Sequence, residues 1–166
     1  MNIRYATMAD LDDIASVEAE CFPVLEAATK EEFEQRIKYY GNHFWLMFDE
    51  GKFIAFVDGF VTDEANLTDE MYENASMHNE NGAWQMIFGV NTLPEYRRCG
   101  YAKELIKKAI LDAREQNRRG LVLTCKESLV PYYSKFGFVD EGITDKSTHG
   151  NVLWHQMRLD FKLRNN

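Results

Sequence analysis

The chain has 166 residues, a net charge of −8 and 45% hydrophobic residues, which is the profile of one folded domain. Its 11 Phe, 8 Tyr and 3 Trp exclude a mainly disordered chain, because such chains lack aromatic residues. The longest apolar runs, 53–57 and 86–90, have five residues each, whereas about 20 are needed to cross a bilayer. The N-terminus has no signal-peptide pattern, so we expect a cytoplasmic protein without a membrane segment.

The N-terminal part predicts a short strand at Ile3–Ala6 and then two helices. The first helix starts at Thr7 and stops at Phe22-Pro23, because proline disfavours the helical conformation of the residue before it. Thr29 and Glu32 form a capping box for the second helix. The apolar positions of the two helices are Leu11, Ile14, Val17 and Cys21, then Phe33, Ile37 and Tyr40, and Gly41 follows the second helix.

The middle of the chain switches to strand patterns. His43–Phe48 and Lys52–Val61 are rich in aromatic and β-branched residues and flank a Gly-containing turn, which predicts a hairpin. Leu67–Met77 reads as a helical connection, and Trp84–Val90 as one apolar strand.

The C-terminal part predicts a long helix and three further strands. The helix lies within Arg97–Arg119, and its apolar face holds Ala102, Leu105, Ile106, Ala109, Ile110 and Ala113. The other expected elements are a buried strand at Leu121–Cys125, a short helix at Leu129–Lys135, and strands at Phe138–Glu141 and Val152–Leu159. The resulting order, β-α-α-β-β-(α)-β-α-β-α-β-β, predicts a mixed α/β domain.

Charge is distributed unevenly along the chain. Residues 97–119 hold eight basic and three acidic residues, whereas the remainder holds 11 basic and 24 acidic residues. A basic segment in an acidic protein predicts one anionic ligand held locally, and the acidic remainder disfavours nucleic acid and favours a cationic partner. The alternative, that the charges serve only solubility, explains the net charge of −8 but not the basic segment at 97–119.

Cysteine and histidine spacing gives no metal-site pattern. The three cysteines are odd in number and lack C-x-x-C spacing, and the four histidines form no H-E-x-x-H pattern. We therefore expect neither a disulfide framework nor a bound metal.

The segment from Val90 to Ala102 carries the clearest chemical signal. A strand ends there, a Pro turn follows, and a helix starts with an Arg-x-x-Gly-x-Ala pattern. Free N–H groups and the helix dipole make such a helix start an anion site, and the residues that would serve a diphosphate are Arg97, Arg98, Gly100, Ala102 and Lys103. A helix start that is merely capped is the alternative. Residues 137–142 have P-loop glycine spacing but lack the Lys and Ser/Thr that complete the motif, and no dinucleotide fingerprint is present.

A second segment, Leu129–Phe138, follows the buried strand and contains Val130-Pro131-Tyr132-Tyr133 and Phe136-Gly137-Phe138. Together the two segments resemble the coenzyme-binding and F-Y-x-x-x-G-F motifs of the GNAT superfamily of acetyl-CoA-dependent N-acetyltransferases. The V-P-Y-Y run looks like the V-P-F-Y of the arylalkylamine N-acetyltransferase branch. Ala55–Gly59 and Ser147–Gly150 with Trp154 look like its bacterial members. The resemblance runs from about Ile3 to Leu159.

The resemblance implies a GNAT-like fold in which residues 1–166 form a single N-acetyltransferase domain, with 161–166 as a loose tail. A central mixed, mostly antiparallel sheet of about seven strands would be flanked by helices. Acetyl-CoA would be the acyl donor: its pantetheine arm would pair with the backbone of Val90, Asn91 and Thr92. Its pyrophosphate would lie on the helix start, where the implied contacts are Arg97, Arg98, Cys99, Gly100, Tyr101, Ala102 and Lys103.

The resemblance also implies the chemistry. Tyr133 would act as general acid for the CoA thiolate, since a phenol with a pKa near about 10 is protonated at neutral pH; a core aromatic is the other reading. The two strand histidines of the arylalkylamine branch are replaced here by Met86 and Phe88. The candidates for the base are therefore His149, Glu20 and a route through solvent.

For the remaining candidate residues, a purely structural role is the alternative to a functional one. Phe22 and Pro23 would belong to the lid over the acceptor, or simply end a helix. Trp84 and Trp154 are core residues or pocket walls. Neither Cys99 nor Cys125 has a neighbouring His, which argues against an acetyl-cysteine intermediate.

The sequence therefore predicts an enzyme, an acyltransferase that acetylates the primary amine of a small, cationic acceptor by direct attack. It has no nucleic-acid or membrane partner, and a homodimer is compatible with the sequence. The alternatives are acetylation of a protein or peptide amine, transfer of a longer acyl chain, and a non-catalytic CoA-binding module.

Overall fold

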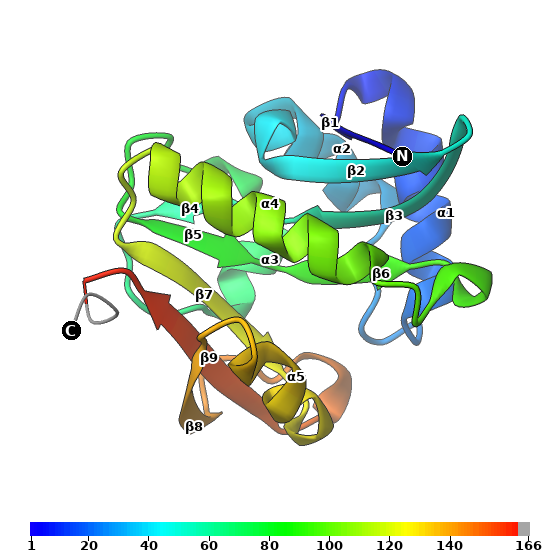
Figure 1. Ribbon diagram of the computed structural model, residues 1–166. Helices are drawn as coiled ribbons and strands as arrows, with labels where there is room; N and C mark the ends of the chain where they lie inside the picture. Colours follow the sequence, from blue (N-terminus) through cyan, green and yellow to red (C-terminus); the bar gives the residue numbers. More distant parts are fainter. Residues whose placement is uncertain (163–166) are drawn as a thin grey trace.

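The computed structural model describes residues 1–162, with the side chain of His149 left out (Figure 1). These residues form two sheets rather than the one sheet of about seven strands that we expected. The first sheet has the order β1 (Asn2–Tyr5), β2 (Phe44–Asp49), β3 (Lys52–Asp58) and β6 (Gly89–Thr92). The second has the order β4 (Val61–Thr62), β5 (Trp84–Ile87), β7 (Gly120–Cys125), β9 (Trp154–Asp160) and β8 (Val139–Thr144).

Five α-helices accompany the sheets: α1 (Leu11–Cys21), α2 (Lys30–Tyr40), α3 (Asp69–Glu73), α4 (Tyr101–Glu115) and α5 (Val130–Ser134). None of the described helices combines the length and apolar character needed to span a membrane. In Figure 1, α4 crosses one side of the sheets and α1 and α2 lie on the other.

Local sequence signals explain the helix starts. At Thr29 both halves of the predicted capping box form: the Glu32 N–H donates to Thr29 Oγ1 at 3.1 Å, and the Thr29 N–H donates to Glu32 Oε1 at 2.9 Å. The helical segment predicted to start at Thr7 has Thr7 as its N-cap, and the Thr7 N–H donates to Asp10 Oδ2 at 2.9 Å, but its first turn is not α-helical. A 3₁₀ turn occupies Met8–Asp10, and α1 begins only at Leu11.

Strand β2 shows how the core is divided between the two faces of the first sheet. Successive side chains of a strand point to opposite faces. Phe44 and Leu46 therefore pack in the cluster beneath α1 and α2, whereas Trp45 and Met47 pack in the cluster beneath α4. Asp112 fixes α4 to this sheet by accepting hydrogen bonds from Trp45 Nε1 at 2.8 Å and the Tyr5 hydroxyl at 2.7 Å.

Two of the predicted strands, at 52–61 and 84–90, are interrupted in the structure. The strand expected at 52–61 ends at Asp58, and β4 starts at Val61. Gly59 between them lies so close to Met86 that a β-carbon there would be 1.8 Å from the Met86 carbonyl oxygen. The strand expected at 84–90 divides at Phe88: Ile87 is the last residue of β5 paired with β7, and Gly89 is the first of β6 paired with β3. The two sheets consequently diverge beyond Ile87, between the edges of β6 and β7.

Candidate functional site

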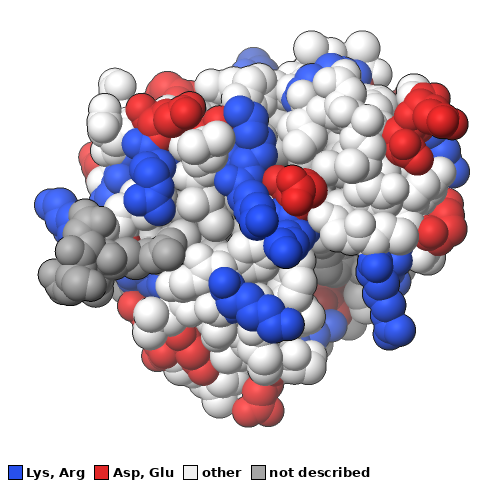
Figure 2. Space-filling model, in the orientation of Figure 1, with Lys and Arg blue, Asp and Glu red and all other residues white. Residues whose placement is uncertain are grey.

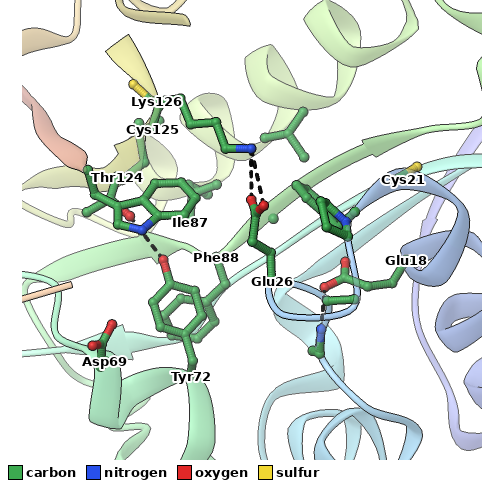
Figure 3. Close-up of a pocket in the computed structure, with 18 of the residues that line it drawn as sticks. Glu18, Cys21, Glu26, Asp69, Tyr72, Ile87, Phe88, Thr124, Cys125 and Lys126 are labelled. Atoms are coloured by element: carbon green, nitrogen blue, oxygen red, sulfur yellow. Dashed lines mark hydrogen bonds and ion pairs between the residues drawn. The ribbon is translucent and has the colours of Figure 1, made fainter. Parts of the chain in front are cut away.

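A cavity of about 430 Å³ opens where the two sheets diverge. Its walls come from four helices, α1, α2, α3 and α5, and from the loop between α1 and α2. The ends of β5, β6, β7 and β9 complete them. Figure 3 shows Glu18 and Glu26 on one side of it and Tyr72 and Asp69 on the other. Acidic residues that line it are Glu18, Glu26, Glu32, Asp69 and Glu73, and the aromatic ones are Phe22, Tyr72, Phe88, Tyr133 and Trp154.

The loop after α1 closes one side of this cavity. Phe22 and Pro23 belong to the lining, and their place in a lid over an acceptor stays a prediction. Two contacts hold the loop: the Ala28 N–H donates to Glu18 Oε2 at 2.9 Å, and Lys126 Nζ lies 3.0 Å from Glu26 Oε1 (Figure 3). The second contact joins the loop to the segment after β7, so the cavity is bridged across its mouth.

Glu18 is the most unusual group in the cavity. Its side chain comes from α1, and the residue is only 5% exposed. While Oε2 accepts the Ala28 N–H, Oε1 is buried without a hydrogen-bond partner. Burial, reinforced by the negative charge of Asp58, raises the pKa of Glu18 to about 7. A carboxyl group with such a pKa can bind and release a proton at neutral pH.

Behind Glu18 lies a buried ion pair between Arg36 of α2 and Asp58 of β3, with Arg36 Nη1 at 3.0 Å from Asp58 Oδ2. Arg36 also donates to the Tyr72 carbonyl oxygen at 2.9 Å and lies over the rings of Phe33 and Phe88. Burial raises the pKa of Asp58, and the Arg36 guanidinium opposes that rise. The pair therefore places a fixed positive charge next to two buried carboxyl groups.

Tyr133 of α5 lines the opposite wall and is 7% exposed. Burial raises the pKa of Tyr133, so the phenol is protonated throughout the neutral range. Within the described part of the chain, no residue forms a hydrogen bond with its hydroxyl group, which leaves the proton available for donation into the cavity. Its role as general acid stays a prediction.

Strand β6 leads from this cavity to the start of α4. Val90 lines the cavity, and two residues further on the Thr92 carbonyl oxygen accepts from Arg97 Nε at 3.0 Å. The chain then turns through Arg98 and Gly100, whose φ angles are +63° and +85°. Glycine is suited to such a left-handed position, and alternating turn conformations of this kind point successive N–H groups to one side.

The backbone N–H groups at this helix start have no acceptor. Among the described residues, none of the N–H groups of residues 98–103 donates a hydrogen bond, and the first bond of α4 runs from the Glu104 N–H to the Gly100 carbonyl oxygen at 3.1 Å. A β-carbon on Gly100 would meet no atom within 4 Å, so the turn is open to a ligand. On the face that carries α4, Lys and Arg side chains form a band (Figure 2). These features fit a diphosphate group.

The other sequence candidates fall in different places. Glu20 is exposed, so it does not share the buried position of Glu18 two residues earlier. The side chain of His149 lies outside the described part of the chain. Met86 is buried in the core, whereas Phe88 lines the cavity. Trp154 is a wall of the cavity, and Trp84 packs in the core with the guanidinium of Arg158 at 4.6 Å from its ring.

Away from the cavity, three side chains of metal-ligating types, those of His43, His78 and Glu80, lie close together. The Gln85 amide nitrogen donates to backbone carbonyl oxygens, so Gln85 Oε1 accepts a hydrogen bond from His43 Nδ1 at 2.9 Å, and His43 Nε2 lies 2.9 Å from Glu80 Oε2. His78 Nδ1 accepts the Val61 N–H at 3.0 Å, so Nε2 donates to Glu80. Each ring nitrogen of the two histidines therefore has a hydrogen-bond partner within the protein.

Comparisons with known proteins agree with this geometry. Residues 11–138 match the acetyltransferase (GNAT) family. Over 93 residues the chain is 31% identical to serotonin N-acetyltransferase of Mesocricetus auratus, a match that covers 55% of this chain and 43% of that protein. The chain thus spans less than half the length of this curated relative.

Solved structures show the same fold over nearly the whole chain. The loading GNATL domain of CurA from Lyngbya majuscula aligns with a TM-score of 0.83 at 17% identity, covering 98% of both chains. The GphF GNAT-like decarboxylase, in complex with isobutyryl-CoA, aligns with a TM-score of 0.79 at 17% identity, covering 96% of this chain and 99% of that one. The family match extends over most of the chain and includes the helix start and Tyr133. The chain belongs to the acetyltransferase (GNAT) family.

Proposed function

We propose that this protein transfers the acetyl group of acetyl-CoA to the primary amine of a small, cationic molecule. The observation that carries the proposal is the joint geometry of one cavity. Carboxylates line its acceptor side, and β6 connects it directly to a helix start with unpaired N–H groups.

The acyl donor would occupy the cleft between β6 and β7. The free N–H groups of residues 98–103, together with Arg97 and Arg98, would hold the pyrophosphate, while Val90, Asn91 and Thr92 offer the backbone of β6 to the pantetheine arm. Because β6 pairs with β3 on one side only, its other edge is available for such pairing.

The cavity supports a small acceptor rather than a protein chain. The Glu26–Lys126 ion pair and the anchored loop after α1 bridge its mouth, so an extended polypeptide would have to displace both. Acidic walls attract a cation and repel an anion. By the same argument they disfavour a substrate that carries a carboxylate, as a decarboxylase requires.

The reaction balances with one acid and one base. The acceptor ammonium loses a proton, its nitrogen attacks the thioester carbonyl carbon, and the C–S bond breaks. Tyr133 gives its phenolic proton to the CoA sulfur, and the second proton lost from nitrogen restores the phenol. The products are the acetamide, CoA thiol and one proton.

The first test is a thermal-shift titration with acetyl-CoA, using NAD and ATP as controls, followed by CoA-thiol detection with serotonin, 2-phenylethylamine and spermidine. Binding at a thousand times Kd adds about 4 kcal/mol, which corresponds to roughly 10 °C for a domain of this size. A shift with acetyl-CoA alone and thiol release dependent on one of these amines support the proposal. No shift at millimolar acetyl-CoA contradicts it.

Charge reversal at the helix start should weaken donor binding. We expect Arg97→Glu/Arg98→Glu to raise the Kd of acetyl-CoA at least about tenfold, since each lost charge-assisted hydrogen bond contributes roughly 1.5–3 kcal/mol. Isothermal titration calorimetry measures this, and the matched control is Arg114→Glu at the far end of the same helix. Equal Kd values for both variants would remove the helix start from the donor site.

Removing the Tyr133 hydroxyl should affect chemistry and not binding. For Tyr133→Phe we expect kcat to fall about 10²-fold, the usual size of a general-acid effect, with the Kd of acetyl-CoA unchanged. Tyr132→Phe, at the neighbouring and more exposed ring, is the control. If Tyr133→Phe retains full kcat, the thiolate takes its proton from another source.

A further inference from the structure

Three unpartnered polar atoms converge at one point of the cavity floor, in front of Gly89. A β-carbon on Gly89 would lie 3.1 Å from Asn91 Nδ2, 3.2 Å from Asp58 Oδ1 and 3.6 Å from Glu18 Oε1. All three atoms are buried and form no regular hydrogen bond among the described residues, and the Asn91 amide lies close enough to Glu18 to favour its ionised form. Because buried polar groups are normally paired, the two carboxyl oxygens point to a ligand atom that donates hydrogen bonds, whereas Asn91 Nδ2 is itself a donor and serves the carboxyl groups.

The three side chains are brought together by the break between β5 and β6. Gly89 and Asn91 are two residues apart and therefore lie on the same face of β6. Asp58 is the direct antiparallel partner of Gly89 on β3. Glu18 reaches the same point from α1, one helical turn after the buried Ile14. Their exposed fractions are 5% for Glu18 and 0% for Asp58 and Asn91. The cluster is therefore built into three rigid elements.

The chemistry of the cluster selects a positively charged nitrogen. Glu18 and Asp58 are carboxyl groups, Asn91 adds an amide, and Arg36 balances one of the two negative charges through Asp58 Oδ2. An ionised carboxylate accepts hydrogen bonds only. Glu18 and Gly89 line the cavity, so this buried point lies next to its acceptor side.

We propose that Glu18 is the catalytic base, and that the acceptor's primary ammonium docks in front of Gly89 against Glu18 Oε1, with Asp58 and Asn91 as positioning residues. This inference rests on the proposed acetyltransferase function and names the base that the sequence left open. The ammonium N–H proton passes to Glu18 Oε1, the nitrogen lone pair is freed to attack the thioester, and Glu18 later releases the proton to solvent through the cavity.

The surroundings of Glu18 fit this role. Among the described residues, the charged and titratable groups that face it are Asp58 on β3, Arg36 on α2 and Cys21 one turn along α1. The neutral amide of Asn91 faces it from β6. Because Glu18 must be ionised to act, kcat/KM is expected to rise with pH and to level off above about 7.

The test uses the amine that gives the highest rate in the serotonin, 2-phenylethylamine and spermidine panel. We expect Glu18→Gln to lower kcat/KM at least 100-fold and to remove the rise of kcat/KM near pH 7 (the pH limb), while the Kd of acetyl-CoA is unchanged. The matched control, Glu20→Gln on the exposed side of the same helix, should stay within twofold of the parent. A Glu18→Gln variant within threefold of the parent, with the same pH limb, overturns the proposal.

Two further results separate the docking site from the base. Gly89→Ala places a methyl group 3.1 Å from Asn91 Nδ2 and 3.2 Å from Asp58 Oδ1, so these side chains must shift. It should raise KM for the amine at least tenfold, with the Kd of acetyl-CoA nearly unchanged as the sign that the fold is retained. An unchanged KM overturns the docking site. Asn91→Ala should shift the pH limb, whereas a variant that lowers activity equally at every pH contradicts its positioning role. A parent protein that binds acetyl-CoA but acetylates no primary amine fails the proposed function itself, and that failure shows before any variant is made.

Discussion

Replacing Arg36 by Met is expected to lower the free energy of unfolding by about 3–5 kcal/mol, because it leaves Asp58 buried without its counter-charge. Arg36 is 3% exposed and Asp58 0%, so water cannot replace the missing guanidinium. The loss also removes the positive charge nearest Glu18 and the hydrogen bond to the Tyr72 carbonyl. Differential scanning calorimetry should show Tm lower by roughly 10 °C.

Two controls accompany this measurement. Lys38→Met, on the exposed side of the same helix, should change Tm by less than 1–2 °C, or about 0.5 kcal/mol. Adding Asp58→Asn to Arg36→Met should recover part of the loss, because the stranded charge is gone. A fall in Tm below 2 °C for Arg36→Met would mean that the ion pair does not hold α2 to β3 in solution.

Glu18→Gln is expected to act on stability in the opposite direction and to raise Tm at pH 8. The pKa of Glu18 rises from 4.5 to about 7 on folding, so the folded state binds more protons than the unfolded chain between these values. Stability is therefore lost as the pH rises through this window. A shift of about 2.5 units corresponds to roughly 3 kcal/mol at 1.36 kcal/mol per unit, or about 5–10 °C.

The pH dependence makes this result specific. Near pH 4.5 the parent carboxyl group is protonated in the folded state, so Gln and Glu should give nearly equal Tm values, and the gain should appear only above neutrality. Gln can also donate to the unpartnered Asp58 Oδ1 from the same position. Glu20→Gln should show no such pH dependence, since Glu20 is exposed. A Glu18→Gln variant that is less stable than the parent at pH 8 contradicts the burial of a charged carboxylate.

Local patterns predicted the helices well. The capping box at Thr29 and Glu32 formed as expected, and α4 buries Leu105, Ile106, Ala109 and Ala113 from its predicted apolar face. These features depend on residues three and four apart, which the sequence displays directly. The predicted start at Thr7 is the N-cap of a 3₁₀ turn that leads into α1, and Asp10 in this turn also pairs with Arg4 of β1 at 2.8 Å, a tertiary contact that helix rules do not include.

Strand interruptions could not be read from hydrophobicity. Phe88 continues the apolar run of β5, so nothing in the pattern marks the point where the strand changes partners. The signals present were glycines: Gly59 allows a close approach to Met86, and Gly89 leaves space in front of the buried polar cluster. Glycine inside a strand pattern often marks such sites.

Glu18 was missed although the sequence contained a signal for it. In the order Leu11, Ile14, Glu18 and Cys21 the spacings are three, four and three, so Glu18 occupies the buried stripe of α1. Glu20 does not lie on this stripe. An acid on an apolar stripe is rare and needs a compensating partner. The partners, Asp58 and Asn91, come from strands 40 and 73 positions away, and only the folded chain brings them together.

The outer edge of the five-stranded sheet bears on how this protein meets other copies of itself. Strand β8 is that edge, and its pairing with β9 slips between Asp140 and Ile143. The two acids at the slip are already engaged, Asp140 with His155 at 3.1 Å and Glu141 with Arg158 at 2.9 Å. Bulges and charges of this kind prevent intermolecular strand addition. A continuous sheet shared by two molecules through β8 is therefore disfavoured, which protects the chain against edge-to-edge aggregation.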